Sequence, residues 1–171
     1  MIRDLGRAFT DDQILPVITQ HFREGSFPSS LVRKMGELGF LGANLQGYGC
    51  AGINNVAYGL IMQELERGDS GVRSFASVQG SLVMYPIHAF GSEAQKQRWL
   101  PRLAAGEAVG CFGLTEPDFG SDPGNMATKA VQVGSEYVLN GTKLWITNGS
   151  IADVAVVWAK LDVVVRGFLV E

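Results

Sequence analysis

The chain has 171 residues and a formal net charge of −3 at pH 7, which argues against a nucleic-acid partner because such partners require a basic surface. No apolar run reaches the roughly 18 residues of a membrane span, and two cysteines with two isolated histidines give no metal site, so neither membrane insertion nor metal binding is expected. The 22 glycines are about twice the average share, which predicts many tight turns or backbone that approaches a ligand closely.

Apolar residues at helical spacing dominate the first part of the chain. Ile2, Leu5 and Phe9 share one face of a predicted helix. The segment 10–13 matches a capping box, which predicts that a new helix begins there. A short helix is expected after Ser29 or Ser30, either of which can cap it, and Gly39 is placed to end it.

Three further helices are predicted before the pattern changes. One covers about 53–67, and the next, at about 72–89, is apolar enough to lie inside a bundle. Ser92 and Gln95 form a capping box that opens the last helix, which Pro101 is expected to end or restart. Residues 1–107 are therefore predicted to form an all-helical N-terminal domain.

Short β-branched and aromatic segments follow Gly106. They cover 109–114, 128–133, 137–139, 142–146, 154–159 and 163–170. The dipeptide Asn140-Gly141 predicts a two-residue hairpin turn between the third and fourth of these segments. Residues 108–171 are therefore expected to form an incomplete antiparallel β domain, and the whole chain has an α+β architecture.

The segment 47–52 spells G-x-G-x-x-G, the pattern of a dinucleotide-binding turn. That site requires a β-branched strand before the glycines and a strand–helix–strand unit around them. The residues before the segment look like the end of a helix and include no β-branched residue. We interpret the segment as a loop between helices.

Two stretches in the second half carry groups that suit a flat ring with a polar edge. Thr115 supplies a hydroxyl at a predicted strand end, and Thr147 supplies a second one beside the aromatic wall of Trp145. Gly120 and Ser121 allow the backbone to approach an anionic group closely. From the pattern alone, a glycine-rich loop and an ordinary core tryptophan explain these residues equally well.

Four motifs resemble the acyl-CoA dehydrogenase family: CFGLTEPDFGSD at 111–122, NGTKLWITN at 140–148, FGSE at 90–93 and WLPRL at 99–103. The resemblance covers essentially the whole chain. It implies a helical domain, a β domain and a C-terminal helical domain, with FAD between the last two. The implied flavin-binding residues are Phe112, Gly113, Leu114, Thr115, Ser121, Trp145, Ile146 and Thr147.

Within that family, the segments 64–74 and 78–87 are similar to glutaryl-CoA dehydrogenases. This similarity implies that Arg73 and Ser74 meet the distal carboxylate of the substrate and that Ser121 contacts the acyl-CoA. A guanidinium suits a carboxylate because it offers two parallel charge-assisted hydrogen bonds. The implied reaction oxidises and decarboxylates glutaryl-CoA to crotonyl-CoA.

The resemblance also implies partners and a compartment. Electrons would pass to an electron-transfer flavoprotein, and the intact family members are usually homotetramers. The compartment would be the cytoplasm in a bacterium or the mitochondrial matrix in a eukaryote.

The catalytic base implied by the resemblance belongs to the C-terminal helical domain, which these 171 residues do not include. No catalytic residue is therefore expected in this chain, and Glu116 is assigned to the cofactor side of its motif. We expect weak FAD retention and no dehydrogenation by the chain alone. The segment 160–166 lacks the glycine that family members commonly have there, so a weakened hairpin is expected.

Two alternatives remain open at this point. The chain could be a non-catalytic remnant or interaction module of the family. It could also belong to a dehydrogenase for simple short-chain acyl-CoA, in which case Arg73 has no role in substrate binding.

Overall fold

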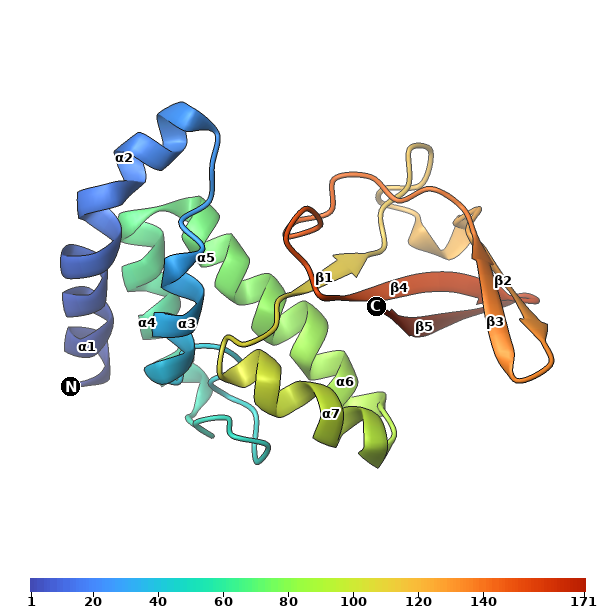
Figure 1. The fold of residues 1–171 in the computed structure, drawn as a ribbon, viewed down its shortest axis with the longest axis horizontal. Helices are drawn as coiled ribbons and strands as arrows, with labels where there is room; N and C mark the ends of the chain where they lie inside the picture. Colours follow the sequence, from blue (N-terminus) through green and yellow to red (C-terminus); the bar gives the residue numbers. More distant parts are fainter. The chain divides into compact units, whose positions relative to one another are not determined.

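The computed structural model describes residues 1–171, which divide into two compact units, Met1–Val109 and Gly110–Glu171. The first unit is helical, and the second is built on one five-stranded sheet with a single 3-10 turn (Figure 1). The predicted succession of a helical part and a β part is confirmed.

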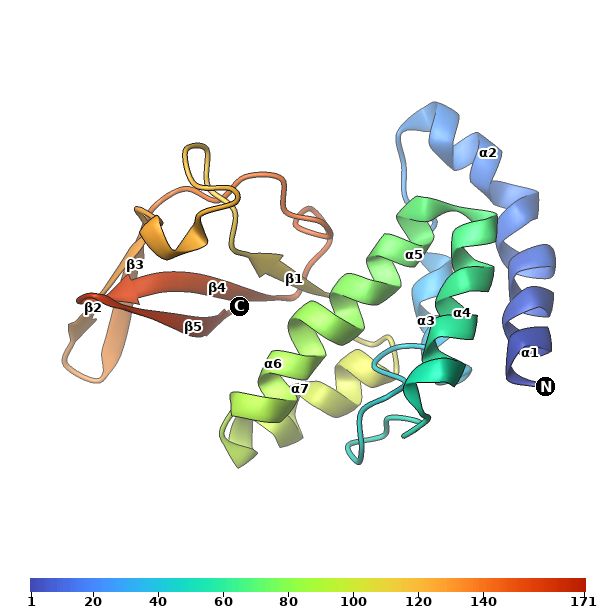
Figure 2. The ribbon, with the colours of Figure 1, turned by 180° about the vertical axis from the view of Figure 1, so that it is seen from behind.

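The helical unit contains seven α-helices: α1 (Ile2–Phe9), α2 (Leu15–Glu24), α3 (Ser30–Glu37), α4 (Asn55–Gly68), α5 (Ser70–Ser77), α6 (Tyr85–Phe90) and α7 (Glu93–Ala104). Two π-helical segments, Thr10–Ile14 and Val78–Met84, make α1–α2 and α5–α6 continuous. Helix α1 packs beside α4, as the front and back views both show (Figures 1 and 2). The core is apolar, and its largest fully buried side chains are Phe40, Phe75, Ile14, Leu31, Met35, Leu41, Ile61, Leu65, Met84, Leu100 and Leu103.

Two predicted helix boundaries are wrong. No new helix begins at Thr10, because the chain stays helical there and the buried Thr10 hydroxyl donates to the carbonyl of Glu64 on α4 at 2.9 Å. Helix α7 does not end or restart at Pro101: the Ala105 N–H donates to the Pro101 carbonyl at 3.0 Å. A proline removes one helical N–H, and here the neighbouring bonds carry the helix past it.

Other predicted signals are confirmed. The Ser92 hydroxyl accepts from the Gln95 N–H while the Gln95 side chain accepts from the Ser92 N–H, so α7 starts with a capping box. Gly39 takes φ +70° directly after α3, the left-handed conformation that ends many helices. The segment 47–52 is a loop between helices, as interpreted from the sequence.

The second unit holds the strands β1 (Gly110–Gly113), β2 (Lys129–Val133), β3 (Glu136–Asn140), β4 (Val154–Leu161) and β5 (Val164–Val170). The sheet is mixed, which corrects the antiparallel expectation: β4 runs parallel to both β1 and β2, and only the pairs β2–β3 and β4–β5 are antiparallel. Parallel pairing needs a long connection. Residues 134–153 provide it between β2 and β4, and they include β3 and the irregular segment 141–153.

Both hairpins turn within or next to the gaps between predicted strand segments, and neither turn is at Asn140-Gly141. The β2–β3 turn is Gly134-Ser135, since Val133 pairs with Glu136, and Gly134 supplies φ +62°. The predicted turn at Asn140-Gly141 and the predicted strand 142–146 are therefore wrong. The β4–β5 hairpin forms without glycine because Asp162 takes φ +57°, a conformation that aspartate tolerates.

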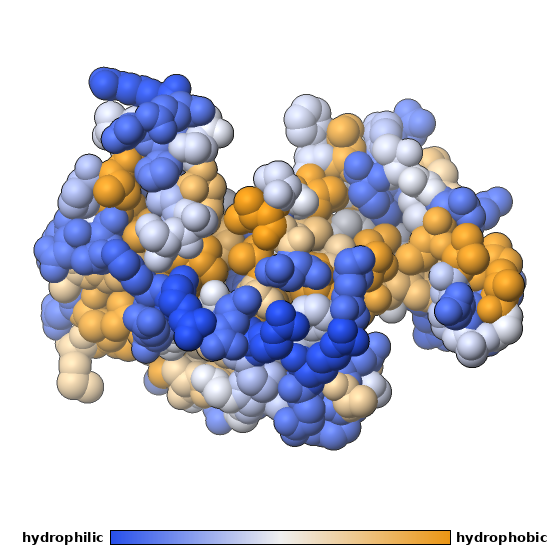
Figure 3. Space-filling model, viewed as in Figure 1, coloured by the Kyte–Doolittle hydropathy of each residue, from blue (hydrophilic) through white to orange (hydrophobic).

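Apolar side chains remain exposed on the β2–β3 hairpin, where Figure 3 shows hydrophobic surface. The exposed residues are Val131, Val133, Tyr137 and Val138. Strands β3 and β5 are edge strands of the sheet, so their outer backbone groups are unpaired within it. None of the helices is long and apolar enough to cross a membrane, and no group of three or more His, Cys, Asp or Glu side chains could hold a metal ion.

Candidate functional site

The candidate site lies in the sheet unit, where the segment 141–153 runs alongside β1. The Leu144 N–H donates to the carbonyl of Thr115, two residues past the end of β1, at 2.9 Å. The Asn148 amide donates to the carbonyl of Gly110, at the start of β1, at 3.2 Å. These two bonds bring together the strand end and the tryptophan segment that the sequence separates by 30 residues.

Trp145 is held in a conformation and an environment that packing alone does not explain. Its side chain is 83% exposed, although tryptophan is usually highly buried. Its φ is +59°, which a residue with a side chain adopts at a cost of about 1–3 kcal/mol. Exposure and backbone strain at one aromatic residue indicate a surface shaped to receive another molecule.

Two hydroxyls belong to the two segments that the Leu144–Thr115 hydrogen bond joins. Thr115 is half-buried and Thr147 is exposed, and neither hydroxyl has a hydrogen-bond partner within the protein. Each can therefore donate to and accept from an external polar group. An aromatic face with two such hydroxyls nearby matches the needs of a flat ring with a polar edge.

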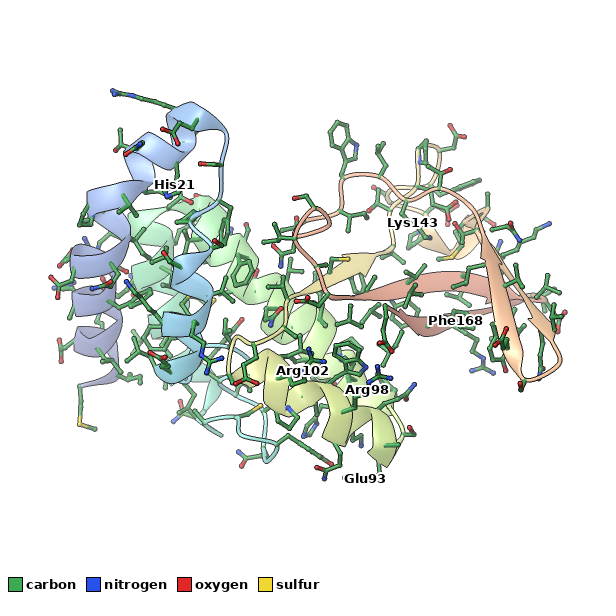
Figure 4. The ribbon with its side chains drawn as sticks, viewed as in Figure 1. His21, Glu93, Arg98, Arg102, Lys143 and Phe168 are labelled. Carbon is green, nitrogen blue, oxygen red and sulfur yellow. The ribbon has the colours of Figure 1, made fainter.

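A largely buried ion pair joins the same two segments. The Glu116 carboxylate, only 3% exposed, accepts from the N–H of Ala127 at 2.6 Å and of Thr128 at 3.0 Å. The Lys143 ammonium, 12% exposed, donates to Glu116 Oε1 at 2.8 Å and to the Leu114 carbonyl at 3.0 Å. Lys143 lies among the loop segments beside β1 (Figure 4).

The environment of Glu116 keeps it ionised. Burial raises the pKa of this carboxyl, but the Lys143 ammonium and the N–H groups of Ala127 and Thr128 outweigh burial and lower the pKa to about 2. The carboxylate is therefore ionised near neutral pH and engaged with Lys143 and two N–H groups. No local sequence signal identifies Lys143 as the partner, because 27 residues separate it from Glu116.

The other candidate residues of the sheet unit have separate surroundings. Phe112 is half-buried on β1, and its ring meets Trp158 of β4 edge-on, with centroids 6.0 Å apart. Gly113 is buried at the end of β1, and Ile146 is half-buried. Ser121 is exposed, and no hydrogen bond joins it to Thr115 or Thr147.

Arg73 and Ser74 lie on α5 in the helical unit. Arg73 Nε donates to Glu66 Oε2 at 2.6 Å, and its Nη1 donates to the Ser77 hydroxyl at 3.5 Å. Hydrogen bonds from Ser70 and from Arg73 lower the pKa of Glu66. The Arg73 side chain is 34% exposed, and its Nη2 has no partner within the protein, so the guanidinium retains donors for an incoming acceptor.

Two families match the chain in succession. Residues 1–107 match the family described as Acyl-CoA dehydrogenase, N-terminal domain. Residues 111–171 match the family described as Acyl-CoA dehydrogenase, middle domain.

Individual relatives agree with these matches. A glutaryl-CoA dehydrogenase of Mycobacterium smegmatis, solved in complex with FADH2, is 59% identical with a TM-score of 0.98, over 99% of this chain and 44% of that one. A chain in the structure of the electron transferring flavoprotein of Acidaminococcus fermentans is 38% identical with a TM-score of 0.95, over 100% of this chain and 47% of that one. The mitochondrial short-chain specific acyl-CoA dehydrogenase of Rattus norvegicus is 41% identical over 95% of this chain and 40% of its own length. The chain thus spans less than half the length of these relatives.

Proposed function

This chain belongs to the acyl-CoA dehydrogenase family, and we propose that its sheet unit supplies the flavin-binding edge of an FAD-dependent dehydrogenase. The observation that carries the proposal is the hydrogen bond from Leu144 to Thr115, because it holds the backbone next to the exposed Trp145 against the segment that follows β1. The relative from M. smegmatis, which was solved with FADH2, supports the same assignment.

The residues present fit a flavin. A flavin offers two broad apolar faces and a long edge of hydrogen-bonding groups. Trp145 provides an exposed aromatic face, and the hydroxyls of Thr115 and Thr147 have no partner within the protein. Phe112, Gly113, Leu114, Ser121 and Ile146 complete the set that we propose holds the cofactor. When bound, FAD would supply the electron acceptor for the oxidation.

The chain's own residues would bind and orient rather than move protons. Thr115 and Thr147 can hold the polar edge of the ring, and Trp145 can cover one face and exclude water from it. We propose no general-base role for Glu116, because its carboxylate is engaged with Lys143 and two N–H groups, which lower its pKa. We therefore assign the proton-abstracting role to no residue of this chain.

For the substrate, we propose an acyl-CoA with a carboxylate at its far end, of the glutaryl type. Arg73 supports this choice because its Nη2 is free and a third of its side chain is exposed. Its bond to Glu66 fixes the guanidinium in place, while Ser74, whose hydroxyl has no partner within the protein, lies next to it on the same helix. Ser121 would contact the acyl-CoA from the sheet unit. An electron-transfer flavoprotein is the proposed acceptor of the electrons.

A chimera tests these proposals. This chain replaces the corresponding segment of the M. smegmatis glutaryl-CoA dehydrogenase, and the purified protein is assayed with glutaryl-CoA and with butyryl-CoA. We expect bound flavin and oxidation of glutaryl-CoA. In Arg73→Ala, kcat/KM for glutaryl-CoA should fall about 100-fold, the cost of one lost charge-assisted contact, while that for butyryl-CoA changes less than about threefold.

Arg23→Ala provides the matched control, because Arg23 is also an exposed arginine of the helical unit and makes no ion pair. This variant should leave both substrates unaffected. Equal losses for glutaryl-CoA and butyryl-CoA in Arg73→Ala would contradict the carboxylate-binding role. That outcome favours a simple short-chain substrate, the activity named for the rat relative.

A further inference from the structure

We infer that Glu116 and Lys143 are positioning residues: their buried ion pair holds the Trp145 loop against the end of β1 and thereby sets the geometry of the proposed flavin site. The expected effect on FAD affinity rests on the proposed function. Its structural part concerns only contacts within the sheet unit.

The pair joins three segments that are distant in sequence. Glu116 accepts from Ala127 and Thr128, which precede β2, and Lys143 reaches from the start of the Trp145 loop to both Glu116 and the Leu114 carbonyl. These hydrogen bonds therefore link three segments: 114–116, 127–128 and the loop that follows Gly141. Each of these segments is irregular, so no strand ladder fixes their mutual positions.

The packing around Gly141 shows how tightly the loop is placed. A Cβ atom on Gly141 would lie 2.2 Å from the Thr128 hydroxyl oxygen and 2.7 Å from Thr128 Cα, so only glycine fits there. Thr128 itself is fixed through its N–H to Glu116 and through its carbonyl, which accepts from the Lys160 N–H of β4 at 2.9 Å. The loop therefore leaves the sheet at a defined point, with Lys143 two residues later.

Beyond the ion pair, two hydrogen bonds hold the loop to β1 and its following residues. They are the Leu144–Thr115 bond and the Asn148–Gly110 bond. Each of these is a single hydrogen bond, and the loop between them carries the strained positive φ of Trp145. The ion pair next to Leu144 adds a further attachment directly beside the strained residue.

The contact between these segments depends on hydrogen-bond geometry as well as on charge. Glu116 must accept from two N–H groups as well as from Lys143, so a cation at position 116 leaves Ala127 and Thr128 without an acceptor. At position 143, by contrast, arginine keeps both the charge and the donors. This asymmetry separates a positioning role from simple charge balance.

The test uses the full chain. Amide hydrogen exchange by NMR follows the Leu144 N–H, and FAD titration follows flavin fluorescence. In Lys143→Met, we expect Leu144 exchange to rise about tenfold or more and FAD affinity to fall about tenfold, while amides of the β4–β5 ladder keep their protection. Lys143→Arg should stay within about threefold of the unmodified chain in both measurements, because the guanidinium still donates to Glu116.

The charge-exchanged double variant Glu116→Lys/Lys143→Glu should behave like Lys143→Met or worse. The control is Lys129→Met, which removes an exposed lysine of the same unit and should change neither measurement. If the exchange rate of the Leu144 N–H is unchanged in Lys143→Met, the inference is overturned. It is also overturned if that exchange rate rises while FAD affinity stays the same. Recovery in the charge-exchanged variant overturns it too.

The unmodified chain separates the two proposals. If it does not bind FAD, the proposed cofactor role fails, and the exchange of Leu144 still decides whether the pair holds the loop. If it binds FAD and Lys143→Met binds FAD equally well, the positioning role fails, and the proposed flavin site is unaffected.

Discussion

The two units each bury one glutamate, and the two carboxylates are held in opposite ways. In the helical unit, Glu64 of α4 is 2% exposed and is held by side chains, with Arg67 at 2.9 Å, Arg3 at 3.2 Å and Arg7 at 3.3 Å. In the sheet unit, Glu116 is held by two backbone N–H groups and one buried lysine. Both have a pKa of about 2.

The difference shows what each carboxylate can stabilise. The arginines around Glu64 belong to helices that already pack through an apolar core. Their guanidinium groups are partly exposed and can be solvated by water if the carboxylate is lost. The partners of Glu116 belong to irregular segments: without the carboxylate the N–H groups of Ala127 and Thr128 would lose their acceptor, and the largely buried Lys143 ammonium would keep only the Leu114 carbonyl as an oxygen acceptor. An ion pair therefore matters most where regular structure does not already fix the backbone.

The largest expected effect comes from removing the carboxylate of the sheet unit. Glu116→Ala should destabilise that unit by about 3–5 kcal/mol, because it leaves a largely buried ammonium without its counter-charge and two N–H groups without an acceptor. Urea unfolding followed by NMR signals of each unit measures it. Glu64→Ala is the matched control and should destabilise the helical unit by clearly less. A larger loss in Glu64→Ala would reverse the comparison.

Acid should weaken both units over the same pH range. Each carboxyl has its pKa lowered from an ordinary 4.5 to about 2. At Glu64 the largest cause is the hydrogen bond from Arg67. At Glu116 burial raises the pKa, but the hydrogen bonds from Lys143 and from backbone N–H groups outweigh it. A lowered folded-state pKa gives stability that is complete above pH 4.5 and is lost as the pH falls toward 2. Stability measured against pH for each unit checks this, and Glu116→Gln should flatten the curve of the sheet unit only.

The smallest expected effect is that of one arginine around Glu64. Arg7→Ala should cost less than about 1 kcal/mol, since Arg7 is exposed and Arg3 and Arg67 remain. Thermal unfolding of the helical unit measures the change. A loss as large as that of Glu64→Ala would mean that Glu64 depends on each partner separately.

Local patterns in the sequence were enough for the helices and most strands. The structure confirms the capping box at Ser92, the end of a helix at Gly39 and the positions of five strands. Each of these depends on residues close together in the sequence. The places of failure were those where a distant contact overrides a local signal. Asn140-Gly141 is a strong turn dipeptide, yet Gly141 packs against Thr128 and the chain leaves the sheet there.

The candidate site divides in the same way. Its motif residues could be named from the sequence because they follow one another along the chain, and the glutaryl-type assignment stays a prediction. The pairing of Lys143 with Glu116, 27 residues apart, could not be read from any periodicity. Nor could the parallel pairing of β1 and β2 with β4.

The sequence by itself determined the succession of helical and β units, the family and the residues that could surround a flavin, because each of these is written in local spacing or contiguous motifs. Only the tertiary structure decided the mixed strand order, the exposed and strained Trp145, and the largely buried ion pair. The physical reason is that burial, backbone strain and ion pairing depend on which distant segments meet, and that is settled by packing the whole unit.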